Sequence, residues 1–152
     1  MQIVFNRKNI IKIAISLVIL LGAAVFFNAL IHHGMERRVF IFPVSGSNKN
    51  KKEIRYLCAN PVQGRVKYYV DELVLGPSFY RGRPLFSLGT KVDYCFQNEN
   101  ILYVGLSGEA VLQDGNALEL SHAAELFKKN IKKNFSSVKN IELFVDGNFI
   151  AD

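Results

Sequence analysis

The longest apolar stretch of the chain runs from Ile13 to Ile31, 19 residues without a charged side chain. As a helix rising ~1.5 Å per residue it spans about 28 Å, close to the ~30 Å hydrocarbon thickness of a bilayer. The pattern predicts a short cytoplasmic tail over residues 1–12 and a transmembrane anchor with its juxtamembrane linker over 13–34. A cleaved signal peptide is the alternative, but its apolar region is normally shorter. No cysteine follows the stretch directly, so a lipid anchor is not indicated.

The flanking charges favour one orientation of this helix. Three basic residues lie directly before the apolar stretch, whereas Arg37 and Arg38 after it are offset by Glu36. Further lysines beyond residue 48 make the overall count nearly balanced. Because positive charges closest to a membrane helix favour the cytoplasmic side, we expect the N-terminus in the cytoplasm. Residues 35–152 are then an extracytoplasmic domain on the outer side of the cell membrane.

Short strand patterns follow in this domain. Runs rich in β-branched and aromatic residues predict strands over 38–43, 53–59, 91–97, 101–106 and 140–145. The polar segment 45–52 is expected to be a loop, and Asp146-Gly147 is a strong hairpin signal after the last strand.

The first of two amphipathic helices is predicted from its punctuation. Asn60 is a suitable N-cap, Pro61 suits the first helical position and Gln63 would complete a capping box. The helix ends at Leu75-Gly76-Pro77, where Gly76 supplies a left-handed residue and Pro77 prevents continuation.

The second helix is predicted to start at Asn116, with Glu119 three residues later as a second capping box. Its apolar stripe consists of Leu120, Ala124, Phe127, Ile131 and Phe135. A lysine face is expected opposite the stripe, made of Lys128, Lys129, Lys132 and Lys133.

The resulting order is β-β-α-β-β-α-β. Hairpins dominate, and strands and helices are mixed, which predicts an α+β fold. We expect a two-layer sandwich in which one mostly antiparallel sheet carries both helices on one face.

Charge and cysteine content narrow the function classes. The net charge is +6. The three basic residues before the anchor account for half of it, and the remaining +3 is too small to suggest a nucleic-acid partner. Cys58 is in phase with the apolar residues Ile54 and Tyr56 of its strand. Cys95 lies between the apolar Tyr94 and Phe96 and is out of phase with them. The two cysteines are therefore expected on opposite sheet faces, as free thiols in preference to a disulfide.

Candidate catalytic residues do not form a recognisable site. His32 and His33 adjoin the membrane segment, His122 lies on the second helix, and Ser107 lacks a nucleophile-elbow context. No phosphate-binding loop or metal-ligand spacing is found in the sequence. We expect no cofactor and no enzymatic activity.

Four short motifs carry a family resemblance. They are Glu72-Leu-Val-Leu-Gly-Pro77, Leu88-Gly-Thr-Lys-Val92, Tyr103-Val-Gly-Leu-Ser107 and Ile141-Glu-Leu-Phe-Val-Asp-Gly147. In this order they resemble the GerMN domain, a sporulation and spore-germination module with a fold like the ring-building motifs of secretion complexes. The resemblance covers roughly residues 37–150, with Gly105 where the family usually has an acidic residue. Leu75, Gly76, Pro77, Gly89, Thr90, Asp146 and Gly147 are then structural motif residues.

These observations predict a non-catalytic, membrane-anchored scaffold that binds other envelope proteins or further copies of itself, as the resemblance to ring-forming modules implies. A sporulation-associated or cell-wall-sensing module is the alternative. Two interaction surfaces are candidates. One is the connection 78–89, with Phe79, Tyr80, Arg81 and Arg83. The other is the lysine face of the second helix, which could bind anionic lipid or nucleic acid, although a solvated face is the preferred interpretation.

Overall fold

The computed structural model describes residues 7–111 and 118–150, and the chain divides into two compact units, residues 1–35 and 36–152. The first unit is the helix α1 (Arg7–Ile31). Its segment Asn9–Ile31 is long and apolar enough to cross a membrane, and it is the one such segment among the described residues. Its large apolar side chains are all exposed. A helix that is apolar all round needs an apolar environment, which lipid would supply.

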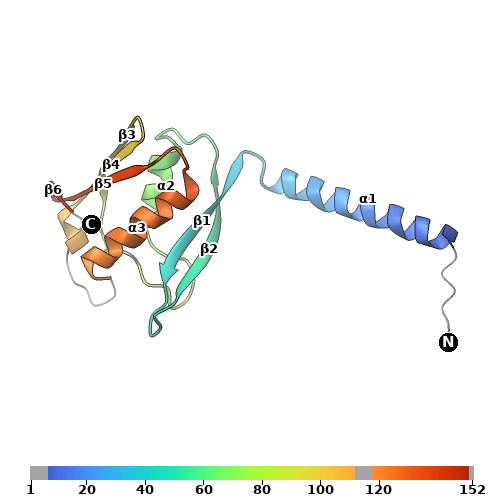
Figure 1. Cartoon of the computed structure of the whole chain (residues 1–152), viewed down its shortest axis with the longest axis horizontal. Helices are drawn as coiled ribbons and strands as arrows, with labels where there is room; N and C mark the ends of the chain where they lie inside the picture. The colour runs from blue at the N-terminus through green and yellow to red at the C-terminus, as the bar shows by residue number, and fades with distance from the viewer. Residues whose placement is uncertain (1–6, 112–117, 151–152) are drawn as a thin grey trace. The chain divides into compact units, whose positions relative to one another are not determined.

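The second unit is α+β and contains two sheets (Figure 1). A two-stranded ribbon pairs β1 (Met35–Pro43) with β2 (Asn50–Cys58). A four-stranded sheet has the order β3-β4-β5-β6, and it consists of β3 (Val92–Asn98), β4 (Ile101–Leu106), β5 (Asn140–Val145) and β6 (Asn148–Phe149). The helices are α2 (Arg65–Val74), the short 3-10 helix η1 (Gly108–Val111) and α3 (Leu120–Asn134).

The predicted strands and helices occur in the expected order, with the short η1 and β6 in addition. The expectation of a single sheet is wrong, although β3–β4 and β5–β6 are antiparallel as expected. The ribbon forms a sheet of its own, and β4 and β5 pair in parallel, from Ile101 beside Asn140 to Leu106 beside Val145. The reason is the crossover through α3, because a helix between two neighbouring strands returns the chain to the end where the first strand began. The bounds of β4 and β5 are as predicted. β2 starts at Asn50, before the predicted start at residue 53. Residues 50–52 are polar and were expected in a loop, but they belong to the strand, in an exposed part of the ribbon.

Apolar alternation does not mark the buried face on two of the strands. On β2, Leu57 is buried while Ile54 and Tyr56 are exposed. On β3, Tyr94 and Phe96 are exposed. β4 and β5 instead bury one face each, with Leu102, Val104, Leu106, Ile141, Leu143 and Val145 in a single core together with residues of α2 and α3.

Both predicted capping boxes are wrong. Gly64 is the N-cap of α2, with φ of 85°, and no side chain caps that end. The backbone turns through residues 61–64, where the Gly64 N–H donates to the Pro61 carbonyl, and the helix begins only afterwards. α3 begins at Leu120 with Glu119 as its N-cap, so Glu119 is not at the third helical position. The expected cap Asn116 lies outside the described residues.

The ribbon is attached to α3 by asparagine side chains. The Ile41 N–H donates to Asn130 Oδ1 at 2.7 Å, and Asn130 Nδ2 donates to the Ile41 carbonyl at 2.9 Å. Asn134 makes the same pair of bonds to the backbone of Val39, at 2.9 and 2.7 Å. The free edge of β1 is thus paired by two amides one helical turn apart. Asn130 is fully buried, so these bonds are shielded from water.

Aromatic stacking fills the space behind this edge. Phe40 and Phe42 of β1 are fully buried, and Phe40 stacks on Tyr69 of α2 with ring centroids 4.5 Å apart. The Tyr69 hydroxyl donates to the Val39 carbonyl at 3.0 Å. Burial also raises the pKa of this hydroxyl, so it stays protonated and available as a donor. The ribbon therefore belongs to the same core as the helices.

Replacing Asn130 by alanine is expected to destabilise the domain by about 3 kcal/mol. The change leaves the N–H and C=O of Ile41 without their amide partner, and each buried unpaired group costs ~1–3 kcal/mol. Chemical denaturation of the full chain in detergent measures the loss. Asn60→Ala is the matched control, because Asn60 is exposed and caps no helix here; it should change stability by less than ~0.5 kcal/mol. Equal losses in both variants would contradict the asparagine attachment.

Candidate functional site

The Leu75-Gly76-Pro77 corner has the backbone geometry that its sequence predicts. Gly76 has φ of 91°, a conformation that side chains disfavour. A Cβ built on Gly76 would also lie 3.2 Å from Cβ of Pro84. Leu75, the C-cap of α2, is exposed. Glycine is therefore required here by both the backbone and its neighbour.

Arg55 of β2 holds this corner in place. Its guanidinium donates to the carbonyl of Gly76 at 2.6 Å and to the carbonyl of Glu72 at 3.1 Å, satisfying the C-terminal end of α2. It also pairs with the carboxylates of Glu53 and Glu72 and lies 4.7 Å from the ring centroid of Phe40. Burial opposes ionisation of Glu53, but hydrogen bonds from Arg55 and Ser78 outweigh it and lower its pKa. The corner is a structural joint between β2 and α2.

The connection 78–89 continues the edge of β1. The Arg83 N–H donates to the Pro43 carbonyl at 2.9 Å, and the Ser45 N–H donates to the Arg81 carbonyl at 2.8 Å. Pro43 has no N–H, so it needs no acceptor at this edge, and its carbonyl accepts from Arg83. The backbone of this connection is therefore hydrogen-bonded to the β1 end of the ribbon at Arg81 and Arg83.

Its four candidate side chains do not form one surface. Phe79 packs partly on the core with Lys51 Nζ 4.5 Å from its ring centroid, and the side chain of Arg83 is half-buried. Tyr80 is 93% exposed. Arg81 is exposed but donates to the Ser45 carbonyl at 3.2 Å. Of the four candidate side chains, only Tyr80 and part of Arg81 therefore face outward.

The remaining motif residues shape turns. Gly89 has φ of 90°, and the Thr90 hydroxyl donates to the Ser87 carbonyl at 2.7 Å just before β3. Asp146 and Gly147 have φ of 49° and 75°, as a two-residue hairpin turn between β5 and β6 requires. None of these residues presents a reactive group to a cleft in the described structure.

The lysine face of α3 borders a groove, and it is not a uniform solvated face. Lys129, Lys132 and Lys133 are exposed, but Lys128 is 9% exposed and belongs to the buried side of the helix. The expected position of Lys128 opposite the apolar stripe is wrong, because helical spacing places it directly beside Ala124 and Ile131 on the buried side of α3. The groove has a volume of about 1170 Å³, and Lys52 of β2 also lines it.

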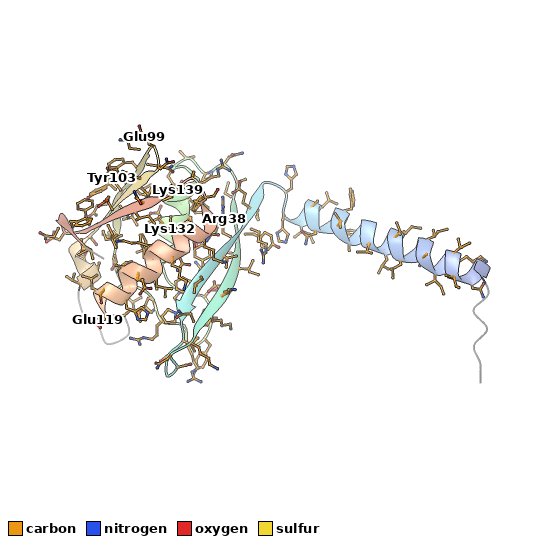
Figure 2. All side chains as sticks on the ribbon, in the orientation of Figure 1. Arg38, Glu99, Tyr103, Glu119, Lys132 and Lys139 are labelled. Carbon is orange, nitrogen blue, oxygen red and sulfur yellow. The ribbon has the colours of Figure 1, made fainter. Side chains whose placement is uncertain are left out.

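An aromatic sheet face is the feature that sequence reasoning missed. Its rings are Tyr103, Phe96, Tyr94, Phe144 and Phe149, which contact one another in this order with centroids 5.1, 6.0, 6.3 and 5.6 Å apart. Phe96 and Phe149 are each more than half exposed. Figure 2 labels Tyr103 on this sheet. The sequence signal is the alternation of Tyr94 and Phe96 along β3, which does not by itself show which face of the strand is buried.

Gly105 makes room for this face. It lies opposite Tyr94 in the β3–β4 pair, and a Cβ on Gly105 would be 2.2 Å from the Tyr94 ring. The tyrosine ring therefore covers the glycine backbone directly. The unusual Gly105 noted in the sequence has a packing reason.

Reactive groups are not gathered in one place. The described residues contain no cluster of three or more His, Cys, Asp or Glu that could hold a metal ion. His122 lines the groove beside α3, and the described residues that line this groove include no cysteine. Both cysteines are free, with Cys58 exposed and Cys95 partly buried. Burial raises the pKa of the Cys95 thiol to about 11, which makes it a poor nucleophile.

Comparison with known proteins gives little more. The chain matches no protein-family model, and no curated protein is similar enough to match. Among solved structures it is similar to a protein described as a putative lipoprotein from Clostridium perfringens, with 18% identity and a TM-score of 0.45. The match covers 77% of this chain and 78% of that chain. Similarity of this degree carries no conclusion about function.

Replacing Arg55 by lysine is expected to destabilise the domain by about 2 kcal/mol. A single ammonium cannot reach both carbonyls and both carboxylates that the planar guanidinium binds. Because the pKa of Glu53 is lowered below 4.5, its contribution is present above that pH and is lost as the pH falls through the lowered value. Thermal unfolding at neutral pH measures the loss. Arg65→Lys is the control, since Arg65 is exposed and makes one pair with Glu36; an equal effect there would count against the joint.

Proposed function

We propose that this chain is a membrane-anchored, non-catalytic interaction protein of a bacterial envelope complex. α1 anchors it in the cytoplasmic membrane with the N-terminus in the cytoplasm, and the α+β domain lies outside. The apolar, fully exposed α1 and the charges before it support the anchor and its orientation.

The observation that carries the interaction role is the aromatic sheet face. Five rings in continuous contact leave two phenylalanines more than half exposed on a small domain. Contiguous exposed apolar patches mark interaction sites, and aromatic side chains dominate binding energy at interfaces. β3 adds to this surface, because it is an edge strand of the sheet and pairs with β4 alone among the described strands.

We propose a second copy of the chain as the partner of this face. The resemblance to the GerMN domain supports this choice, since modules with that kind of fold pack side by side into rings or collars. The GerMN assignment itself rests on the four sequence motifs. A role in cell-wall sensing through residues 78–89 is less favoured, because the backbone at Arg81 and Arg83 and the side chains of Phe79 and Arg81 make contacts within the domain.

Cys58 offers a direct test of the orientation. Since it is exposed on β2, a membrane-impermeant maleimide added to intact protoplasts should label it within minutes. Cys95, partly buried with a raised pKa, should react much more slowly. Labelling is followed by mass shift of the purified chain, with Cys58→Ser as the control that removes the fast reaction. Labelling that requires permeabilised membranes would reverse the proposed orientation.

Photo-crosslinking tests the partner. A benzoylphenylalanine at position 149 of the full chain in its native membrane should give a covalent product of twice the monomer mass. Benzoylphenylalanine in place of Tyr80, which is exposed but is not part of the aromatic sheet face, should give little of this product. Gly105→Ala should weaken self-association roughly fivefold, since displacing the Tyr94 ring removes an aromatic contact worth about 1 kcal/mol. A strictly monomeric chain with no product at position 149 would refute the role of this face.

A further inference from the structure

The groove between the β1–β2 ribbon and α3 has the features of a ligand site of its own. It has a volume of about 1170 Å³, and positive charge comes from two different elements. Lys129, Lys132 and Lys133 line it from α3, and Lys52 lines it from β2. Lys132 is labelled on α3 in Figure 2. The charges therefore stand on both walls.

The balance of charge in the groove favours an anion. Four exposed lysines line it, three from α3 and one from β2, and among the described lining residues Glu125 is the single acidic one. Lys128 also lines the groove, but it is largely buried and has a contact of its own within the domain. Like charges held close together repel one another, and a bound anion would relieve that cost. Ile41 and Ala124, which are apolar, also line the groove, which suits a ligand with non-polar parts between its charges.

We infer that this groove binds a linear polymer of phosphodiesters that carries no bases, such as a polyol phosphate chain. Lys129 and Lys133 lie one helical turn apart on α3 with Lys132 beside them, which places successive charges ~6 Å from each other along the groove. Lysine binds phosphate as a point charge from any direction, which suits a flexible chain. No aromatic residue is found among the described lining residues, so nucleobases would have no ring to stack on.

A flat anionic membrane surface fits the groove less well than a chain. Lysines on two walls of a groove cannot all contact one flat surface, whereas a polymer chain lying between the walls contacts both. The groove also includes Asn50 and Lys52 near the start of β2, at the turn end of the ribbon.

The site is independent of the aromatic sheet face. The groove is formed by the ribbon and α3, and the aromatic rings stand on the side of the four-stranded sheet away from the buried core. One surface can thus hold a polymer while the other holds a protein, and loss of either function leaves the other measurable.

Binding of an end-labelled poly(glycerol phosphate) to the full chain in nonionic detergent tests the proposal by fluorescence anisotropy at several salt concentrations. Lys52→Gln combined with Lys132→Gln removes one charge from each wall. This double variant should bind at least about tenfold more weakly, and its salt slope should fall by about 1.4, since each phosphate contact to a single strand contributes ~0.7. Lys91→Gln combined with Lys139→Gln makes the same change in net charge at exposed positions outside the groove. This control should stay within about twofold of the unmodified chain.

Equal weakening by the two double variants would show general attraction to a basic protein and would overturn the site, as would binding that neither variant changes. Competition by glycerophosphoglycerol, the soluble headgroup of an anionic lipid, separates a headgroup site from a polymer site. At equal phosphate concentration the polymer should compete at least about tenfold better, because linked phosphates bind with a high effective concentration. Equal competition would identify a lipid headgroup as the ligand. Undiminished self-crosslinking in the Lys52/Lys132 variant would confirm that the fold and the aromatic face are intact.

Discussion

The arrangement of this domain depends on how the outer edge of β1 is satisfied. A buried strand edge cannot be left without hydrogen bonds, and none of the described strands lies beyond β1. α3 supplies two side-chain amides instead, from Asn130 and Asn134. The match is geometric, because four helical residues rise ~6 Å and two strand residues advance ~6.6 Å. This pairing fixes the ribbon against α3 and so creates the groove between them.

A second set of contacts transmits this placement to the rest of the domain. Phe40 lies between Tyr69 and the guanidinium of Arg55, and Arg55 reaches the carbonyl of Gly76. The ribbon, α2 and the corner after α2 are therefore one joint. The corner with its glycine and proline is conspicuous in the sequence, but its role is to fix the chain path. The surfaces available to partners lie on the sheet and beside α3.

Local signals predicted local structure well. Gly76 and Asp146-Gly147 were identified correctly because a positive φ is a property of few residues. β4 and β5 were bounded correctly because their apolar alternation coincides with burial in the core. The capping boxes failed because Gly64 provides a competing turn that no spacing rule weighs. The order of the strands in two sheets, the parallel pair and the lysine groove all depend on contacts between distant residues, which one sequence does not reveal.

The candidate sites follow the same division. The lysines of α3 were found from the sequence, but their partner Lys52 on the facing wall was not. The aromatic face was hidden because exposed and buried alternation look alike on a strand. Burial of Tyr94 or Phe96 would have required a second layer on that side of the sheet, and the described chain provides none.

The contact between Tyr94 and Gly105 has an evolutionary consequence. The ring occupies the space of a missing Cβ, so the two positions cannot be substituted freely one at a time. A relative with a side chain at position 105 should carry a small residue at 94, and a relative that keeps the tyrosine should keep the glycine. Such covariation would trace which lineages retain the exposed rings, and with them the surface they form.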